Sequence, residues 1–220
     1  MVGAVRGLVF FDVDGTLVPG TSTSQHLADW LGHLAELSAA EAAYDAGTLS
    51  NEEACVLDAL AWRGRTPAEV HDRLASLPVV DGITDTVEWC RARGVRPYLA
   101  TLAWEPVARY LAGRFGFAGC CGPTLAIVNG YYTGDVELHF DEYDKRDFAA
   151  ATAAAAGVPL SACAAVGDSR SDLPLFAEVG LPVAFNATPA VEAVAAHAVR
   201  GSDLRAVLPY LRSWLDLPAP

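Results

Sequence analysis

Short apolar runs alternate along the chain with longer stretches in which apolar residues recur every three or four positions. The short runs lie at residues 8–11, 95–100, 163–166 and 181–185, and their length is typical of buried strands. The helical spacing between them predicts helices over residues 82–93, 105–115, 144–156, 172–178, 188–195 and 203–215. Strands that alternate with helices in this way indicate an α/β fold, a Rossmann-like parallel sheet with helices on both faces.

Residues 19–80 carry the helical pattern alone and contain no second strand-like run. A capping box with proline at the first helical position begins one of these helices at Thr66 and Pro67. Helices in this segment are predicted over residues 38–46, 51–61 and 67–77. We therefore predict a small helical cap domain at 19–80, inserted after the first strand, and a core domain formed by residues 1–18 and 81–220. Such a cap would exclude water from a site at the end of the sheet.

One antiparallel element is expected within the core domain. Asn129 and Gly130 separate residues 123–128 from residues 131–137, and this dipeptide is a strong signal for a tight hairpin turn. A small β-hairpin is therefore predicted near 123–137.

The charge of the chain narrows the possible partners. Its formal net charge of −12 would repel nucleic acid and an anionic membrane surface. No apolar run reaches the roughly 18 residues that cross a bilayer. The five cysteines show no metal-finger spacing, which favours reduced thiols. We expect a cytoplasmic protein, a monomer or homodimer, that acts on a small molecule.

The first apolar run leads directly into two carboxylates, Asp12 and Asp14, followed by a glycine and a threonine. Ligands of open α/β sheets bind at this end of the strands. If the strand continued to residue 14, both carboxylates would point the same way, and a divalent cation would keep both ionised. An acidic turn without any chemistry explains an isolated Asp-x-Asp-Gly equally well.

Two further residues with suitable chemistry follow later in the chain. Thr101 ends the strand predicted over 95–100, where its hydroxyl and the N–H groups of Leu102 and Ala103 could bind phosphate oxygens. Threonine is also an ordinary strand residue. Lys145 is the single lysine, near the start of a helix, where a cation opposes the helix dipole. Its ammonium could neutralise a carboxylate and phosphoryl oxygens, although most such clusters are solvated helix starts.

A last group of acids follows the run at 163–166. Asp168 comes directly after this strand, and Asp172 lies four residues later on the first turn of a helix. Asp172 could be only a helix cap. Together with Asp12 and Asp14, however, these carboxylates form an oxygen donor set suited to Mg²⁺.

In chain order, these segments resemble the four motifs of the haloacid dehalogenase superfamily. The first motif matches the string from Asp12 to Val18, the second Thr101, the third Lys145, and the fourth the string from Val166 to Pro174. The helical insertion and the hairpin resemble the subgroup that contains phosphoserine phosphatase. The resemblance covers essentially the whole chain, and the second acid, Asp14, favours phosphate over halide chemistry.

The resemblance implies a Mg²⁺-dependent phosphatase that hydrolyses a small-molecule phosphate monoester through an aspartyl-phosphate. It implies that Asp12 is the nucleophile, that Asp14 is the general acid and base, and that Thr101 and Lys145 bind the phosphoryl group. The metal ligands it implies are Asp12, Asp14 through its backbone carbonyl, Asp168 and Asp172, the last of which could instead orient Lys145. The residues expected to contact substrate are Thr101, Leu102, Lys145, Ser171, Thr21 and His26.

The substrate is expected to differ from phosphoserine. An ungapped alignment places Thr21 and Asp58 where serine phosphatases of this subgroup carry an acid and an arginine, and neither suits the ammonium or the carboxylate of phosphoserine. The polar start of the cap, residues 21–26, predicts a neutral or sugar-like alcohol phosphate. Phosphoserine phosphatase, a phosphomutase or phosphotransferase with the same nucleophile, and a non-catalytic binding protein are the alternatives. His26 could equally be a packed residue without a functional role.

Overall fold

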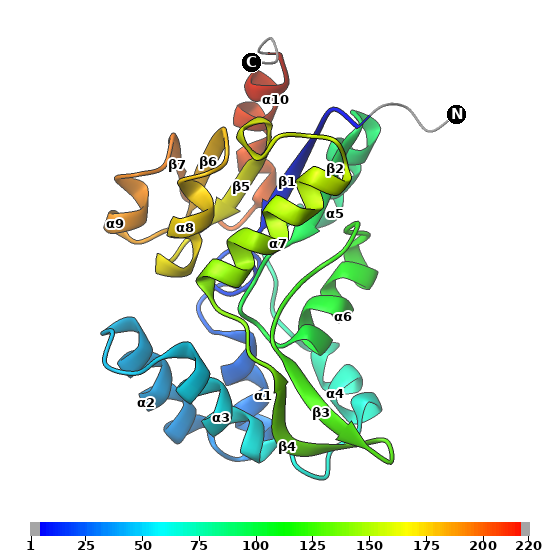
Figure 1. Ribbon diagram of the computed structural model, residues 1–220, viewed down its shortest axis with the longest axis vertical. Coiled ribbons are helices and arrows are strands. Elements are labelled where there is room, and N and C mark those ends of the chain that lie inside the picture. Colours follow the sequence, from blue (N-terminus) through cyan, green and yellow to red (C-terminus); the bar gives the residue numbers. More distant parts are fainter. Residues whose placement is uncertain (1–4, 217–220) are drawn as a thin grey trace.

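A five-stranded parallel sheet forms the centre of the computed structural model, which describes residues 5–216 (Figure 1). The strand order is β2-β1-β5-β6-β7. The strands are β1 (Gly7–Phe11), β2 (Val95–Leu99), β5 (Ala164–Gly167), β6 (Leu181–Phe185) and β7 (His197–Val199). β1 lies between β2 and β5, with Val9 level with Pro97 on one side and Ala164 on the other. β1 is therefore an interior strand, and the residues after Phe11 begin at the carboxyl-end edge of the sheet between β2 and β5.

Helices cover both faces of this sheet, because alternate residues of β1 belong to different apolar clusters. Val9 and Phe11 pack with one cluster, and Leu8 and Phe10 with the other. The helices of the core are α5 (Ile83–Ala92), α6 (Glu105–Phe115), α7 (Glu142–Ala155), α8 (Leu173–Phe176), α9 (Pro189–Glu192) and α10 (Leu208–Asp216), with 3₁₀ turns at Leu160–Ala162, Arg170–Asp172 and Leu204–Val207. The predicted fold class is confirmed.

Four helices lie between β1 and α5 in the chain and beyond the carboxyl ends of the strands (Figure 1). They are α1 (Thr23–Leu31), α2 (Leu34–Asp45), α3 (Asn51–Ala61) and α4 (Pro67–Leu74), and we call them the cap helices. A hairpin of β3 (Thr124–Val128) and β4 (Tyr131–Leu138) extends beside them. Tyr132 exchanges backbone hydrogen bonds of 2.9 Å with the chain at Gly64 and Arg65. The hairpin is thus attached to the cap helices, although the sequence placed it with the core.

The structure settles three local points. The first strand ends at Phe11, as the apolar run 8–11 indicates, so Asp14 lies in the loop that follows. β7 was not predicted, because its three residues are too few to show a periodicity, and it is defined by pairing with β6. The helix predicted over 172–178 is a 3₁₀ turn followed by the four residues of α8. Within residues 5–216, no helix is long and apolar enough to cross a bilayer.

Candidate active site

The buried ammonium of Lys145 joins two carboxylates at the end of the sheet. Its Nζ donates to Asp12 Oδ1 at 2.8 Å and to Asp172 Oδ1 at 2.6 Å. Lys145 is fully buried and Asp12 is 4% exposed. These residues lie 133 and 27 positions from Lys145 in the chain, so only the fold brings them together.

The start of α7 places Lys145 at this position. The side chain of Asp141 accepts hydrogen bonds from the N–H groups of Tyr143 and Asp144, and Asp144 bonds back to the Asp141 N–H at 3.0 Å. This capping box holds the first helical turn, on which Lys145 lies. Burial alone would lower the pKa of Lys145, but the carboxylates of Asp12 and Asp172 hold that pKa above its ordinary value. Lys145 therefore remains a cation at neutral pH.

Asp172 is held by the backbone as well as by the lysine. Its Oδ2 accepts hydrogen bonds from the N–H groups of Asp168 at 2.9 Å and Ser169 at 3.1 Å. A Cβ on Gly167 would overlap the Asp172 carboxyl group, so a glycine is required there. Asp172 therefore contacts both the Lys145 ammonium and the backbone at the end of β5.

Three carboxylates gather beside the lysine. Oxygens of Asp12, Asp168 and Asp172 lie within 4.8 Å of one another, and Asp168 also accepts a hydrogen bond of 3.0 Å from the Thr16 hydroxyl. Burial, together with the charges of Asp12 and Asp172, raises the pKa of Asp168 to about 9. Burial also raises the pKa of Asp12 to about 6, against the lowering effect of Lys145. Three acids with one ammonium leave excess negative charge, and hard oxygen donors of this kind fit a divalent cation such as Mg²⁺.

Asp14 has different surroundings from Asp12. Its carboxylate accepts hydrogen bonds from the Thr23 N–H at 2.6 Å and the Thr23 hydroxyl at 3.2 Å, at the start of α1. Burial raises the pKa of Asp14 to about 7. A carboxyl group with a pKa near neutrality can both give and take a proton. The Asp14 side chain is not part of the three-carboxylate cluster, so its role as a ligand through the backbone carbonyl stays a prediction.

A cavity of about 450 Å³ lies between the sheet and the cap helices, with the carboxylates in its wall. Thr101, buried at the end of β2, lines it and accepts a hydrogen bond of 3.0 Å from the Ala103 N–H. The expected site residues that line the cavity are Asp12, Asp14, Thr101, Leu102, Asp168 and Ser171 from the core, and Thr21 from the start of the cap segment. Lys145 and Asp172 are buried beside Asp12.

The expected contact between His26 and substrate is not supported. His26 Nε2 lies 3.4 Å from the Arg73 carbonyl and 3.4 Å from the Ser76 hydroxyl, and His26 is not among the described residues that line the cavity. Its neighbour Gln25 does line it. The described polar contacts of the His26 ring are with Arg73 and Ser76, within the cap.

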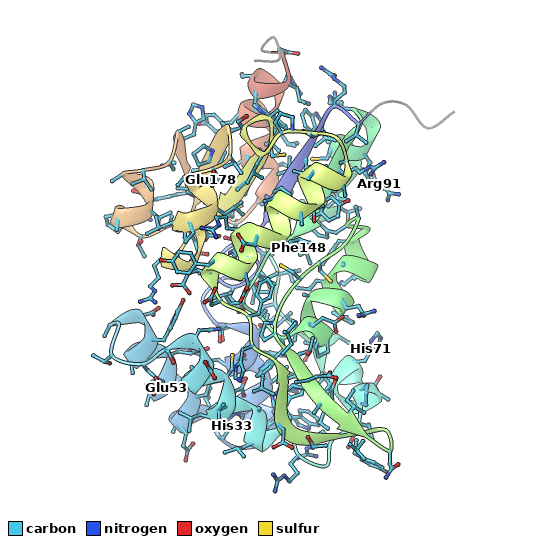
Figure 2. The ribbon with its side chains drawn as sticks, viewed as in Figure 1. His33, Glu53, His71, Arg91, Phe148 and Glu178 are labelled. Carbon is cyan, nitrogen blue, oxygen red and sulfur yellow. The ribbon has the colours of Figure 1, made fainter. Side chains whose placement is uncertain are left out.

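Sequence reasoning missed Glu41 and the role of Asp58. Glu41, on α2, lines the cavity and accepts hydrogen bonds from the Ser22 hydroxyl and the Gln25 amide. Asp58 is buried, with one oxygen 2.7 Å from Nε2 of His33, which Figure 2 labels on the cap. Its other oxygen accepts a hydrogen bond of 2.6 Å from Trp104 Nε1. A glutamate within a helix rich in alanine carried no signal that would separate it from a surface residue.

Comparison with known proteins agrees with this geometry. Residues 9–177 match the model of the haloacid dehalogenase-like hydrolase family, and the chain belongs to that family. It is 28% identical over 211 residues to a phosphoserine phosphatase of Albidiferax ferrireducens, covering 91% of this chain and 87% of that protein. It is 31% identical over 202 residues to the Streptomyces coelicolor phosphoserine phosphatase, covering 91% of this chain and 49% of that protein.

A solved structure extends the comparison to three dimensions. A phospho-aspartyl intermediate analogue of phosphoserine phosphatase is 25% identical, with a TM-score of 0.81, covering 93% of this chain and 98% of that chain. The superfamily assignment and the prediction of a phosphatase are confirmed.

The raised pKa values of the buried carboxyl groups predict how the stability of the protein depends on pH. In metal-free protein the pKa values of Asp12, Asp14 and Asp168 are about 6, 7 and 9, above the ordinary carboxyl value of about 4 in an unfolded chain. The folded state therefore binds more protons than the unfolded state across this window, and its stability falls as pH rises. The raised pKa of Lys145 changes the stability only at pH values above this range, where a lysine in the unfolded chain begins to lose its proton.

We expect the Tm measured in EDTA to fall between pH 5 and pH 9. Mg²⁺ binds the ionised carboxylates, so the Tm gain on adding Mg²⁺ should be larger at pH 8 than at pH 5. Thermal unfolding followed by circular dichroism at each pH measures both quantities. A Tm in EDTA that rises steadily over this range would contradict the assignment of these pKa values.

Proposed function

We propose that this phosphatase hydrolyses a small-molecule phosphate monoester in a Mg²⁺-dependent reaction, with Asp12 as nucleophile. The observation that carries the proposal is a pair of carboxylates in opposite surroundings. Asp12 is bound to the buried cation Lys145, whereas the described hydrogen bonds to the Asp14 side chain come only from the uncharged donors of Thr23. The first environment favours an ionised nucleophile, and the second favours a group that exchanges protons.

The proposed reaction uses the two acids in sequence. Lys145 binds Oδ1 of Asp12, which leaves the other oxygen to attack phosphorus and form an acyl-phosphate bond while the ester P–O bond breaks. The leaving alkoxide takes the proton of Asp14. Asp14 then takes a proton from water, which attacks phosphorus, and inorganic phosphate leaves as the Asp12 carboxylate is restored.

In this proposal, side chains of the protein stabilise the negative charge of the phosphoryl group. Lys145 supplies a fixed positive charge beside Asp12, and the Thr101 hydroxyl lies in the cavity wall. The Mg²⁺ would be held by Asp12 and Asp168, with Asp172 in the same cluster of oxygens. When bound, this ion supplies positive charge that offsets the crowded carboxylates and the phosphoryl oxygens.

The setting of the reaction is also part of the proposal. A cavity of about 450 Å³ fits a small molecule. The net charge of −12 argues against nucleic acid as substrate. All five cysteines are free thiols, which agrees with the cytoplasm as the proposed location.

A screen of phosphate esters tests the proposed function. The purified protein is incubated with p-nitrophenyl phosphate and a panel of amino-alcohol, polyol, sugar and amino-acid phosphates, each with Mg²⁺ and with EDTA. We expect phosphate release from at least one ester with Mg²⁺, and a loss of at least about 100-fold in EDTA, because the carboxylates then lack their counter-charge. Release that is equal in EDTA, or absent from every ester, would refute the proposal.

A further inference from the structure

The cavity wall is strongly acidic. Its lining includes the carboxylates of Asp12, Asp14 and Asp168 at the sheet, and those of Glu41, Asp45 and Asp58 on the cap helices. The described residues that line it include no lysine, arginine or histidine. The three acids at the sheet belong to the proposed chemistry. The three on the cap face the part of the substrate that does not react.

Among the cap acids, Glu41 is the one that is partly shielded from solvent and hydrogen-bonded, among the described contacts, only to uncharged groups. Asp58 is paired with His33 and Trp104, and Asp45 is exposed to solvent. Glu41 is partly buried, and the described donors to it are the uncharged hydroxyl of Ser22, at 2.5 Å from Oε1, and the amide of Gln25. These bonds hold its carboxylate in place but leave its charge uncompensated, and a partly buried uncompensated charge favours a cationic ligand.

Glu41 is held close to the general acid by consecutive residues. Ser22 donates its hydroxyl to Glu41, and Thr23 donates its N–H to Asp14 at 2.6 Å. Burial and then the charge of Asp12 raise the pKa of Asp14, and the charge of Glu41 adds a smaller contribution in the same direction. A leaving oxygen beside Asp14 and a group bound to Glu41 can therefore belong to one short molecule.

We propose that the alcohol released by this enzyme is a short amino alcohol without a carboxylate, and that Glu41 binds its ammonium group. This proposal rests on the proposed function and names the substrate class of the same site. An ammonium group would compensate Glu41, whereas a substrate carboxylate would meet only acids and neutral groups on this wall. The aromatic rings of Tyr44 and Trp104, which also line the cavity, suit the flanks of an organic cation.

A substrate with a carboxylate, such as phosphoserine, would need a cation near the cavity, and Arg170 is the arginine to consider. It packs 4.2 Å from the ring centre of Tyr44, donates to the Tyr44 carbonyl at 3.1 Å and lies 3.5 Å from Glu142. These contacts hold Arg170 against Tyr44 and near Glu142, and it is not one of the described lining residues. A substrate carboxylate could reach Arg170 only if these contacts broke.

Steady-state kinetics with three esters of similar size test the proposal. The purified full chain with Mg²⁺ is assayed on phosphoethanolamine, glycerol 3-phosphate and phosphoserine, with p-nitrophenyl phosphate as a general substrate. We expect kcat/KM for phosphoethanolamine to exceed the values for the other two by at least about tenfold. In Glu41→Gln, which keeps the shape and removes the charge, the ratio of phosphoethanolamine to glycerol 3-phosphate should fall by at least about tenfold, mainly through KM.

Glu36→Gln is the matched control, since Glu36 is an exposed glutamate on the same helix, α2, and the ratio should not change. Higher kcat/KM for glycerol 3-phosphate or phosphoserine than for phosphoethanolamine would overturn the substrate class. An unchanged ratio in Glu41→Gln would overturn the role of Glu41. If p-nitrophenyl phosphate and all three esters were left intact, the proposed function itself would fail, which distinguishes the two failures.

Discussion

Replacement of Asp12 by asparagine is expected to lower kcat/KM for every phosphate ester by at least about 1,000-fold, because an amide oxygen cannot form the acyl-phosphate bond. Asp12 is the first residue after the central strand, and its amide is held by the Val166 carbonyl at 2.9 Å. The main chain is thus fixed at Asp12, and the hydrogen bond from Lys145 Nζ to Oδ1 orients the side chain. Release of p-nitrophenol in the presence of Mg²⁺ measures the effect.

The same substitution should leave the fold intact. Burial raises the pKa of Asp12 to about 6, so the carboxylate present at pH 8 costs the metal-free folded protein stability relative to the unfolded chain, and asparagine removes that cost. We expect the Tm of Asp12→Asn in EDTA at pH 8 to equal or exceed that of the native chain. The exposed Asp147, changed to asparagine, serves as control and should keep full activity. More than about a tenth of native activity in Asp12→Asn would rule out Asp12 as nucleophile.

Replacement of Lys145 by methionine is expected to reduce both activity and stability. Methionine fills a similar volume but leaves Asp12 and Asp172 buried without their shared cation. Breaking a buried ion pair by removing one partner typically costs about 3–5 kcal/mol, and loss of a fixed charge at a phosphoryl site lowers the rate by about 100-fold or more. Urea unfolding and ester hydrolysis measure the two effects.

The stability loss in Lys145→Met should depend on pH. Without the ammonium, the pKa values of the neighbouring carboxyls rise further, so the folded protein takes up protons that the unfolded chain does not hold. The deficit in the free energy of unfolding should therefore be smaller at pH 5 than at pH 8. Arg146→Met is the matched control, since Arg146 is the next cation on α7 and its partner Asp147 is exposed. Equal stability of Lys145→Met and the native chain at pH 8 would contradict the assigned role.

Much of the core could be predicted from the sequence because its signals are local. The apolar run of β1, the helix 105–115 and the turn at Asn129 and Gly130 depend on residues within a few positions of one another. The polar residues after Phe11 form a turn and do not continue the pleat of the strand. That turn is what gives Asp12 and Asp14 different neighbours.

Some residues of the candidate site could likewise be predicted from the sequence, and others could not. Lys145 is the single lysine of the chain, and the resemblance of the sequence to a known family connects it to Asp12. The directions of His26 and Glu41 could not be predicted, because both lie on helices, where a change of one residue turns the side chain by about 100°. Their direction depends on how the cap helices pack, which no local pattern contains.

The order of residues along this chain determined most of its strands and helices and the acids, hydroxyl and lysine available for phosphate chemistry, since each depends on short-range periodicity or on residue type. Tertiary structure alone decided the charge balance of the cavity. It paired Asp58 with His33 and Trp104, and it left Glu41 beside neutral donors next to Asp14. Electrostatic interactions act through space over a few ångströms, so they depend on which distant segments meet.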